Sequence, residues 1–226
     1  MGLLKKFLFA IFGFFFIIFF STALTWLVLD NTLIVSEPYQ TLIDNYANNL
    51  FEEIPVDLNN NIKEDITLGL KVYVEQSIDF IKEKRIDVNV TGNTSESNLI
   101  LNSITINFQE ALNKLKESYK LGKLLGLICL ALAIILIGIV SIFSRDPKEI
   151  ISWLSTNLII ATIPIILIAY LTKYILNNFI VNNLPEFGQL INTIISTFTN
   201  TLLTYGVIFL IIGIVLFVVK FFIPNK

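Results

Sequence analysis

The stretch "LLGLICLALAIILIGIVSIFSRDPKEIISWLSTNLIIATIPIILIAYLT", residues 124–172, decides the fold of this chain. It contains two uncharged apolar runs, 124–143 and 150–172, on either side of a short charged joint. Each run is long enough to cross a bilayer, because about 20 apolar residues rising roughly 1.5 Å each span a hydrocarbon core of ~30 Å. The joint has room only for a tight turn. The stretch therefore predicts two membrane-spanning helices that form an antiparallel hairpin.

Two further apolar runs lie outside this hairpin, at residues 7–29 and 202–219. The first resembles a secretory signal, but it is longer than the roughly 7 to 15 residues of a cleaved signal's apolar region and has no small-x-small cleavage pattern. We expect it to remain as a membrane anchor. Apolar residues recur at helical spacing from 187 to 201, and polar residues fill the other face, which predicts an amphipathic helix. This helix and the last span form either one long helix or two helices with a bend.

The composition agrees with a membrane protein. Only 15% of the residues are charged, against about 25% in soluble domains, and 54% are hydrophobic. We predict an all-α membrane protein with four transmembrane helices and a small, mainly helical extracytoplasmic domain. The predicted segments are 1–29 (first span), 30–121 (outer domain), 122–144 (second span), 145–149 (turn), 150–176 (third span), 177–201 (outer loop with the amphipathic helix) and 202–226 (fourth span).

The basic residues of the short connections give the orientation, because cytoplasmic loops are enriched in Lys and Arg. When the four spans alternate, one side receives Lys5, Lys6, Arg145, Lys148, Lys220 and Lys226. We predict that this side is cytoplasmic and that the protein lies in the plasma membrane with both termini inside. Residues 30–121 are then outside the cell.

The predicted outer domain contains two helical patterns, at 39–54 and 62–81, separated by Pro55. Alternating apolar residues in "RIDVNV" and, less regularly, in "LILNSITIN" allow a short β-hairpin across Gly92. Asn107 and Glu110 have the spacing of a capping box, so we expect a third helix to begin there and to run unbroken into the second span.

Two sequons lie in the same domain, Asn89-Val90-Thr91 and Asn93-Thr94-Ser95. Such triplets accept N-linked glycans where the machinery exists. They also arise by chance in a chain rich in asparagine, and an ordinary polar turn built on Gly92 and Asn93 is the alternative interpretation.

The residue inventory argues against catalysis. The chain has no histidine and a single cysteine, Cys129, within the second span. The commonest general base and metal ligand is therefore missing, and one thiol cannot form a zinc site. Two pairs of carboxylates, Glu52 with Glu53 and Glu64 with Asp65, are adjacent in sequence, so on a helix they do not face each other, and we interpret them as parts of a solvated face. We predict a protein that is not an enzyme and has no catalytic residue, cofactor or metal.

Polar and small residues in the membrane segments suggest two other roles. A water-accessible vestibule between the third span and the amphipathic segment is one interpretation, and its candidates are Asn157, Thr162, Asn192 and Ser196. Hydroxyl groups more often bond to their own helix than line a pore, which is the alternative. Glycines at helix-packing spacing are Gly122, Gly126, Gly206 and Gly213. We expect them to lie in seams of the chain's own bundle, with homo-oligomerisation as the second interpretation.

The layout shares features with two kinds of four-span protein. Claudins share a larger first outer loop, but their outer cysteine pair and tryptophan motif are missing here. The chain more closely resembles uncharacterised prokaryotic membrane proteins in which a first span is followed by a helical outer domain, with a helix of the "YVEQSIDFIK" type, a piece such as "SITIN", and a helix that enters three further spans. This resemblance covers most of the chain as layout and implies no activity.

We therefore expect a non-enzymatic interaction, assembly or sensing component of the cell envelope, with a small transporter or channel subunit as the alternative. Membrane lipid, a protein partner of the outer domain and a second copy of the chain are the expected partners. Residues 30–123 hold fifteen acids and nine bases, which disfavours nucleic acid.

Overall fold

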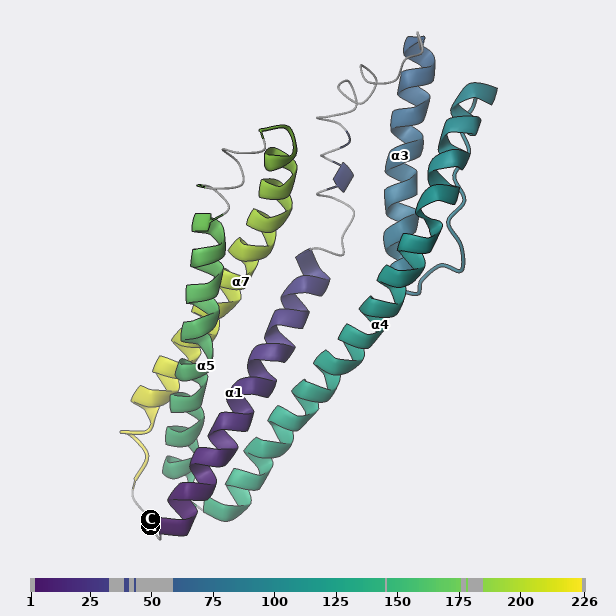
Figure 1. Ribbon diagram of the computed structural model, residues 1–226. Coiled ribbons are helices and arrows are strands. Elements are labelled where there is room, and N and C mark those ends of the chain that lie inside the picture. The colour runs from purple at the N-terminus through teal and green to yellow at the C-terminus, as the bar shows by residue number, and fades with distance from the viewer. Residues whose placement is uncertain are drawn as a thin grey trace. The chain divides into compact units, whose positions relative to one another are not determined.

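The computed structural model describes residues 3–32, 39–40, 43, 59–144, 146–175, 178 and 185–224. Its long helices are α1 (Leu3–Thr32), α3 (Asn60–Ile81), α4 (Ser95–Ser144), α5 (Pro147–Ile175) and α7 (Pro185–Val219) (Figure 1). No strand occurs among the described residues. The chain forms two units: a first unit of Met1–Leu33 and Lys123–Lys226, and a second unit of Ile34–Gly122.

Four helices of the structure are long and apolar enough to cross a membrane: α1, α4, α5 and the part Ile195–Val219 of α7. The predicted hairpin is confirmed, because α4 ends at Ser144 and α5 begins at Pro147. The open question about the last segment is also answered. Residues 185–219 form one helix, so the amphipathic pattern and the last apolar run belong to the same element.

Helix α1 contributes to two apolar clusters of described residues in the first unit. The first cluster joins α1, α4 and α5 through the buried residues Phe9, Phe16, Ala133, Val140, Trp153 and Leu158. The second joins α1, α5 and α7 through Leu24, Val28, Ile165, Ala169 and Leu202. Aromatic rings connect the same helices, with Phe20 and Phe209 in edge contact at 5.0 Å between centroids. Figure 1 shows α7 crossing α5 within this unit.

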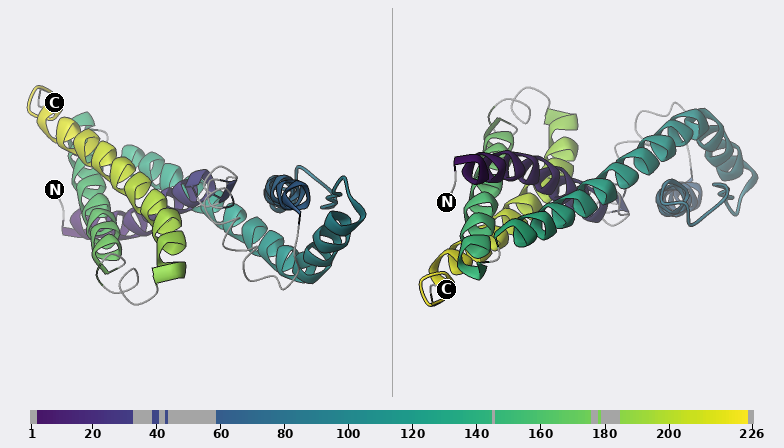
Figure 2. Two further views of the ribbon diagram at one scale, coloured as in Figure 1. Left: turned by 90° about the horizontal axis from the view of Figure 1, so that it is seen from above. Right: turned by 90° about the horizontal axis from the view of Figure 1, so that it is seen from below.

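In the second unit, α3 and the first part of α4 run parallel. Three contacts have the same sequence separation of 32 residues: residue 65 with 97, 69 with 101, and 80 with 112. Figure 2 shows α3 nearly end-on beside the start of α4. Because parallel helices need a return connection, residues 82–94 run back along α3. Val88 packs with Phe80 near the end of α3, and Asn93 bonds to Asp65 near its beginning.

The return segment, residues 82–94, begins at the C-terminal end of α3. Glu83 has a φ of 61°, in the left-handed region, and its N–H bonds to the carbonyl of Phe80. The N–H of Lys84 bonds to the carbonyl of Asp79 at 2.8 Å. These two bonds define a Schellman motif, which satisfies the last carbonyls of α3. They also reverse the direction of the chain.

Two predictions for this unit were wrong. The piece "LILNSITIN" is not a strand, because residues 95–144 are continuous helix, and "RIDVNV" therefore has no strand to pair with. The third helix begins at Ser95, not near Asn107. Its start is fixed by contacts with Asp65, distant in sequence, which local patterns do not reveal. The second predicted helix is confirmed as α3, whereas 39–54 lies outside the described residues except for Tyr39, Gln40 and Ile43.

Candidate functional site

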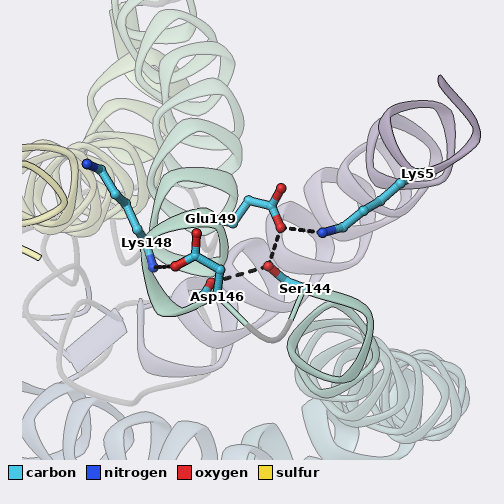
Figure 3. A network of polar contacts seen from close by, with 5 residues as sticks. All are labelled: Lys5, Ser144, Asp146, Lys148 and Glu149. Carbon is cyan, nitrogen blue, oxygen red and sulfur yellow. Dashed lines mark hydrogen bonds and ion pairs between the residues drawn. The ribbon is translucent and has the colours of Figure 1, made fainter. Parts of the chain in front are cut away.

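Charged and hydroxyl side chains meet where α1 begins and where α4 turns into α5 (Figure 3). The amine of Lys5 lies 2.5 Å from the Oε2 atom of Glu149, and the pair is about three-quarters buried. The Ser144 hydroxyl donates to the same carboxylate oxygen. One partly buried ion pair therefore ties the first turn of α1 to the first turn of α5.

The same turn is organised by Asp146, the N-cap of α5. Its side chain accepts the N–H of Lys148 at 3.0 Å, and its carbonyl accepts the N–H groups of Glu149 and Ile150. Acidic groups are favourable at this end of a helix because they satisfy free N–H groups and complement the helix dipole. Glu149 is already paired with an amine and a hydroxyl, so this network holds helices together and offers no free general base.

A second polar contact lies inside the first unit, between α5 and α1. The indole N–H of Trp153 donates to the carbonyl of Phe9 at 2.9 Å. One turn further along α5, the amide of Asn157 donates to the carbonyl of Trp153 at 2.7 Å. A Cβ atom on Gly13 would lie only 2.4 Å from the Oδ1 atom of Asn157. Gly13 therefore provides the space in which the buried Asn157 side chain packs against α1.

The packing of α5 against α7 determines how far apart the vestibule candidates lie. Ile159 packs against Gly213, Ile166 against Gly206, and Lys173 bonds to Asn200 at 3.1 Å, which defines an antiparallel register.

In this register Asn157 is level with residue 215. Asn192 is some 23 residues away along α7, roughly 35 Å at 1.5 Å per residue. Thr162 is fully buried and donates to the carbonyl of Leu158, whereas Asn192 and Ser196 are half-buried. The structure does not bring these four residues together.

Three of the four packing glycines face neighbouring helices of the same chain. A Cβ atom would lie 2.5 Å from Trp26 if built on Gly126, 2.8 Å from Ile166 if built on Gly206, and 2.9 Å from Ile159 if built on Gly213. Small residues allow such close approach of helices in membranes. Gly122 is half-buried on α4.

In the second unit a single carboxylate, that of Asp65, accepts several hydrogen bonds from residues at the start of α4. Asp65 accepts the backbone N–H and the side-chain amide of Asn93 at 2.6 and 2.8 Å. It also accepts the N–H of Thr94 at 3.2 Å and the hydroxyl of Ser97. Thr94 and Ser97 in turn bond to each other, because the N–H of Ser97 donates to the Thr94 hydroxyl and the N–H of Thr94 to the Ser97 hydroxyl. This is the reciprocal pattern of a capping box.

Next to Asp65, the side chain of Asn98 bonds both the N–H and the carbonyl of Gly92, at 2.8 and 2.9 Å. Any Cβ on Gly92 would lie 2.1 Å from the Ser97 hydroxyl, so only glycine fits here. The Ser97 hydrogen bond lowers the pKa of Asp65, desolvation opposes this change, and the bonds from Asn93 and Thr94 lower the pKa further, so that it lies below its ordinary value.

Both sequon asparagines are exposed, but their surroundings differ. Asn93 is held by Asp65 as described, whereas only the backbone N–H of Asn89 is held, by the Gln76 side chain at 3.0 Å. Among the described residues, no group of three or more His, Cys, Asp or Glu side chains is placed to hold a metal ion. Cys129 is buried within α4.

The sequence analysis did not single out Trp153 or Gly13, and it named Asp65 only with Glu64, as part of a solvated face. Gly13 could have been recognised from the sequence, because it is one of the few small residues in a span filled with phenylalanine and small residues mark close helix contacts. The role of Asp65 depends on contacts 28 to 32 residues away, for which a single sequence contains no periodic signal.

The described residues are helical apart from their connections, and the four long apolar helices indicate a multi-pass membrane protein, with the second unit between the first two candidate spans in sequence. No protein-family model, curated protein or solved structure matches the chain.

Proposed function

We propose that the protein is a non-enzymatic component of the cell envelope that binds a partner protein through its second unit, outside the cell. The observation that carries this proposal is the apolar surface of α4. Leu99 and Ile106 are 72% and 74% exposed, and their spacing of seven places them on one face of the helix. We interpret these two exposed apolar side chains, in a part of the chain that carries many charges, as points of contact for a partner protein.

The polar side chains of the first unit support binding over transport. Thr22, Thr25, Thr156, Thr162 and Thr204 each donate to a carbonyl of their own helix. Hydroxyl groups bonded in this way do not need water or a transported solute to satisfy them.

Site-specific photo-crosslinking in intact cells tests the proposal. A photoreactive side chain at Ile106 should give a discrete adduct heavier than the 25.6 kDa chain. The same side chain at Asn107 is the matched control, because Asn107 is also exposed but points about 100° away on the helix. A specific adduct at Ile106 supports binding. No adduct at Ile106 or Leu99, together with solute flux in liposomes that contain the purified protein, would favour the transporter alternative instead.

A further inference from the structure

The return segment of the second unit places its side chains alternately inside and outside. Val88 and Val90 are buried, whereas Asp87, Asn89 and Thr91 are exposed. The segment also runs along much of α3 with few residues. Between Asn89 and Asn93 it passes from Gln76 to Asp65, about 16 Å along α3 at 1.5 Å per residue, and four residues reach at most about 14 Å, so the side chains of α3 supply the remainder.

An extended segment presents residues i and i+2 on one face. Asn89 and Thr91 are such a pair, so the amide and the hydroxyl of the first sequon are exposed together. The backbone N–H of Asn89 is anchored to Gln76, which fixes the direction of the segment. Among the described residues, no hydrogen bond involves the Asn89 side chain. The first sequon is therefore presented with an unengaged amide on an ordered scaffold.

The second sequon is engaged at all three positions. The Asn93 amide nitrogen donates to Asp65 at 2.8 Å. Thr94 caps α4 through its hydroxyl and carbonyl, and Ser95 is the first residue of the helix, with its hydroxyl bonded to Glu96. A helical start does not place Asn93 and Ser95 side by side as an extended chain does. Modification of Asn93 would also replace one of the two hydrogens on the amide nitrogen that donates to Asp65.

We propose that Asn89, and not Asn93, is an acceptor for an N-linked glycan supplied by a lipid-linked oligosaccharide. In the transfer, the amide nitrogen of Asn89 forms a bond to C1 of the donor sugar, and the bond from C1 to the donor's phosphate oxygen breaks. The lipid phosphate leaves with the electron pair, and the amide loses one proton to the medium. In the cell, this site rests on the outward placement of the second unit proposed above.

The test uses the purified full chain in detergent, incubated with an oligosaccharyltransferase and its lipid-linked oligosaccharide, with glycopeptides identified by mass spectrometry. We expect a glycan on Asn89 alone. Asn89→Gln and Thr91→Ala should abolish modification, Thr91→Ser should retain it, and Asn93→Gln should leave it unchanged. Asp65→Ala releases the Asn93 amide and also removes the bonds that hold Thr94 and Ser97 at the start of α4, so it should add a second glycan at Asn93.

A synthetic peptide of residues 85–97 serves as the unfolded control. If the enzyme modifies this peptide but leaves Asn89 of the folded chain unmodified, or modifies Asn93 of the folded wild-type chain, the proposal is wrong. Detergent exposes both membrane faces, so this result does not depend on orientation. A second experiment uses sealed vesicles with the outer face of the membrane outward and adds the enzyme to the external medium. Modification in detergent but not in these vesicles would support the acceptor geometry and overturn the outward placement.

Discussion

Asp65 shows how one side chain can fix the boundary of an element that begins 30 residues later. The start of any helix leaves N–H groups without partners inside the helix and carries partial positive charge. Asp65 brings a carboxylate from α3 to this position and bonds Asn93, Thr94 and Ser97 at once. The anion that commonly binds at a helix start is here supplied by the chain itself.

This arrangement predicts a pH dependence at the start of α4. Because the folded-state pKa of Asp65 lies below the ordinary value of about 3.9, the carboxylate stabilises the fold at neutral pH. This stabilisation is lost as the pH falls through the folded-state pKa. Amide hydrogen exchange, corrected for its intrinsic pH dependence, should show falling protection of the α4 start in strong acid.

The matched variant is Asp65→Asn, which keeps the shape of the side chain but removes its charge. It should show reduced protection of the α4 start already at neutral pH and little further change down to pH ~3. Protection equal to that of the wild type at neutral pH would mean that the charge of Asp65 does not hold the helix start.

At the scale of the elements, α4 is the longest helix, with 50 residues that belong to both units. Its continuity from Phe108 onward was predicted because no breaker occurs there. Leu115 is more than half exposed, so a substitution at this position tests the backbone and removes little packing.

Leu115→Pro should destabilise the second unit by about 3 kcal/mol or more, because proline removes one backbone hydrogen bond and its ring clashes with the preceding turn. Leu115→Ala is the control, since it truncates the same side chain and favours helix. Chemical unfolding followed by circular dichroism compares the two variants. Equal unfolding midpoints for the proline and alanine variants would show that α4 is interrupted near this position.

The elements that could be predicted from the sequence are those determined by local sequence patterns. Apolar runs of about 20 residues have one stable conformation in a bilayer, so the spans and the hairpin at 145–149 could be recognised from composition alone. The alternation of Ile86, Val88 and Val90 was interpreted as one strand of a possible hairpin, and this was wrong. Val88 and Val90 are buried but Ile86 is 93% exposed, and Val88 packs with Phe80 of α3 and Leu112 of α4. Buried alternate residues can pack against helices as well as against a strand, so the alternation alone does not identify their partner.

The candidate sites were less predictable for the same reason. Asn157 was recognised as unusual within a span, but its neighbour Gly13 lies 144 residues earlier in the chain. Asn192 and Ser196 were grouped with it on polarity, whereas the register of α5 and α7 is set by packing at Gly206 and Gly213. Polarity identifies residues that need partners, and only tertiary packing determines which partners they have.

For the whole molecule, the basic residues at the helix ends predict which side of the membrane each connection faces. Three lysines lie at helix ends: Lys5 at the start of α1, Lys148 at the start of α5 and Lys220 just after α7. If the four spans alternate in direction, all three lysines lie on the same side of the membrane. Short basic connections are retained in the cytoplasm, whereas long loops cross largely regardless of charge. The second unit should therefore be outside the cell and Lys220 inside.

Cysteine labelling tests this orientation in a Cys129→Ser background. Asn113→Cys lies in the exposed part of α4 in the second unit, and Phe222→Cys follows the end of α7, where the side chain is 81% exposed. An impermeant maleimide should label position 113 in intact cells and position 222 only after permeabilisation. The Cys129→Ser chain alone should remain unlabelled, since its one thiol is gone. Labelling of position 222 but not 113 in intact cells would reverse the orientation, and the sequon at Asn89 would then face the cytoplasm, where no oligosaccharyltransferase of the cell envelope could reach it.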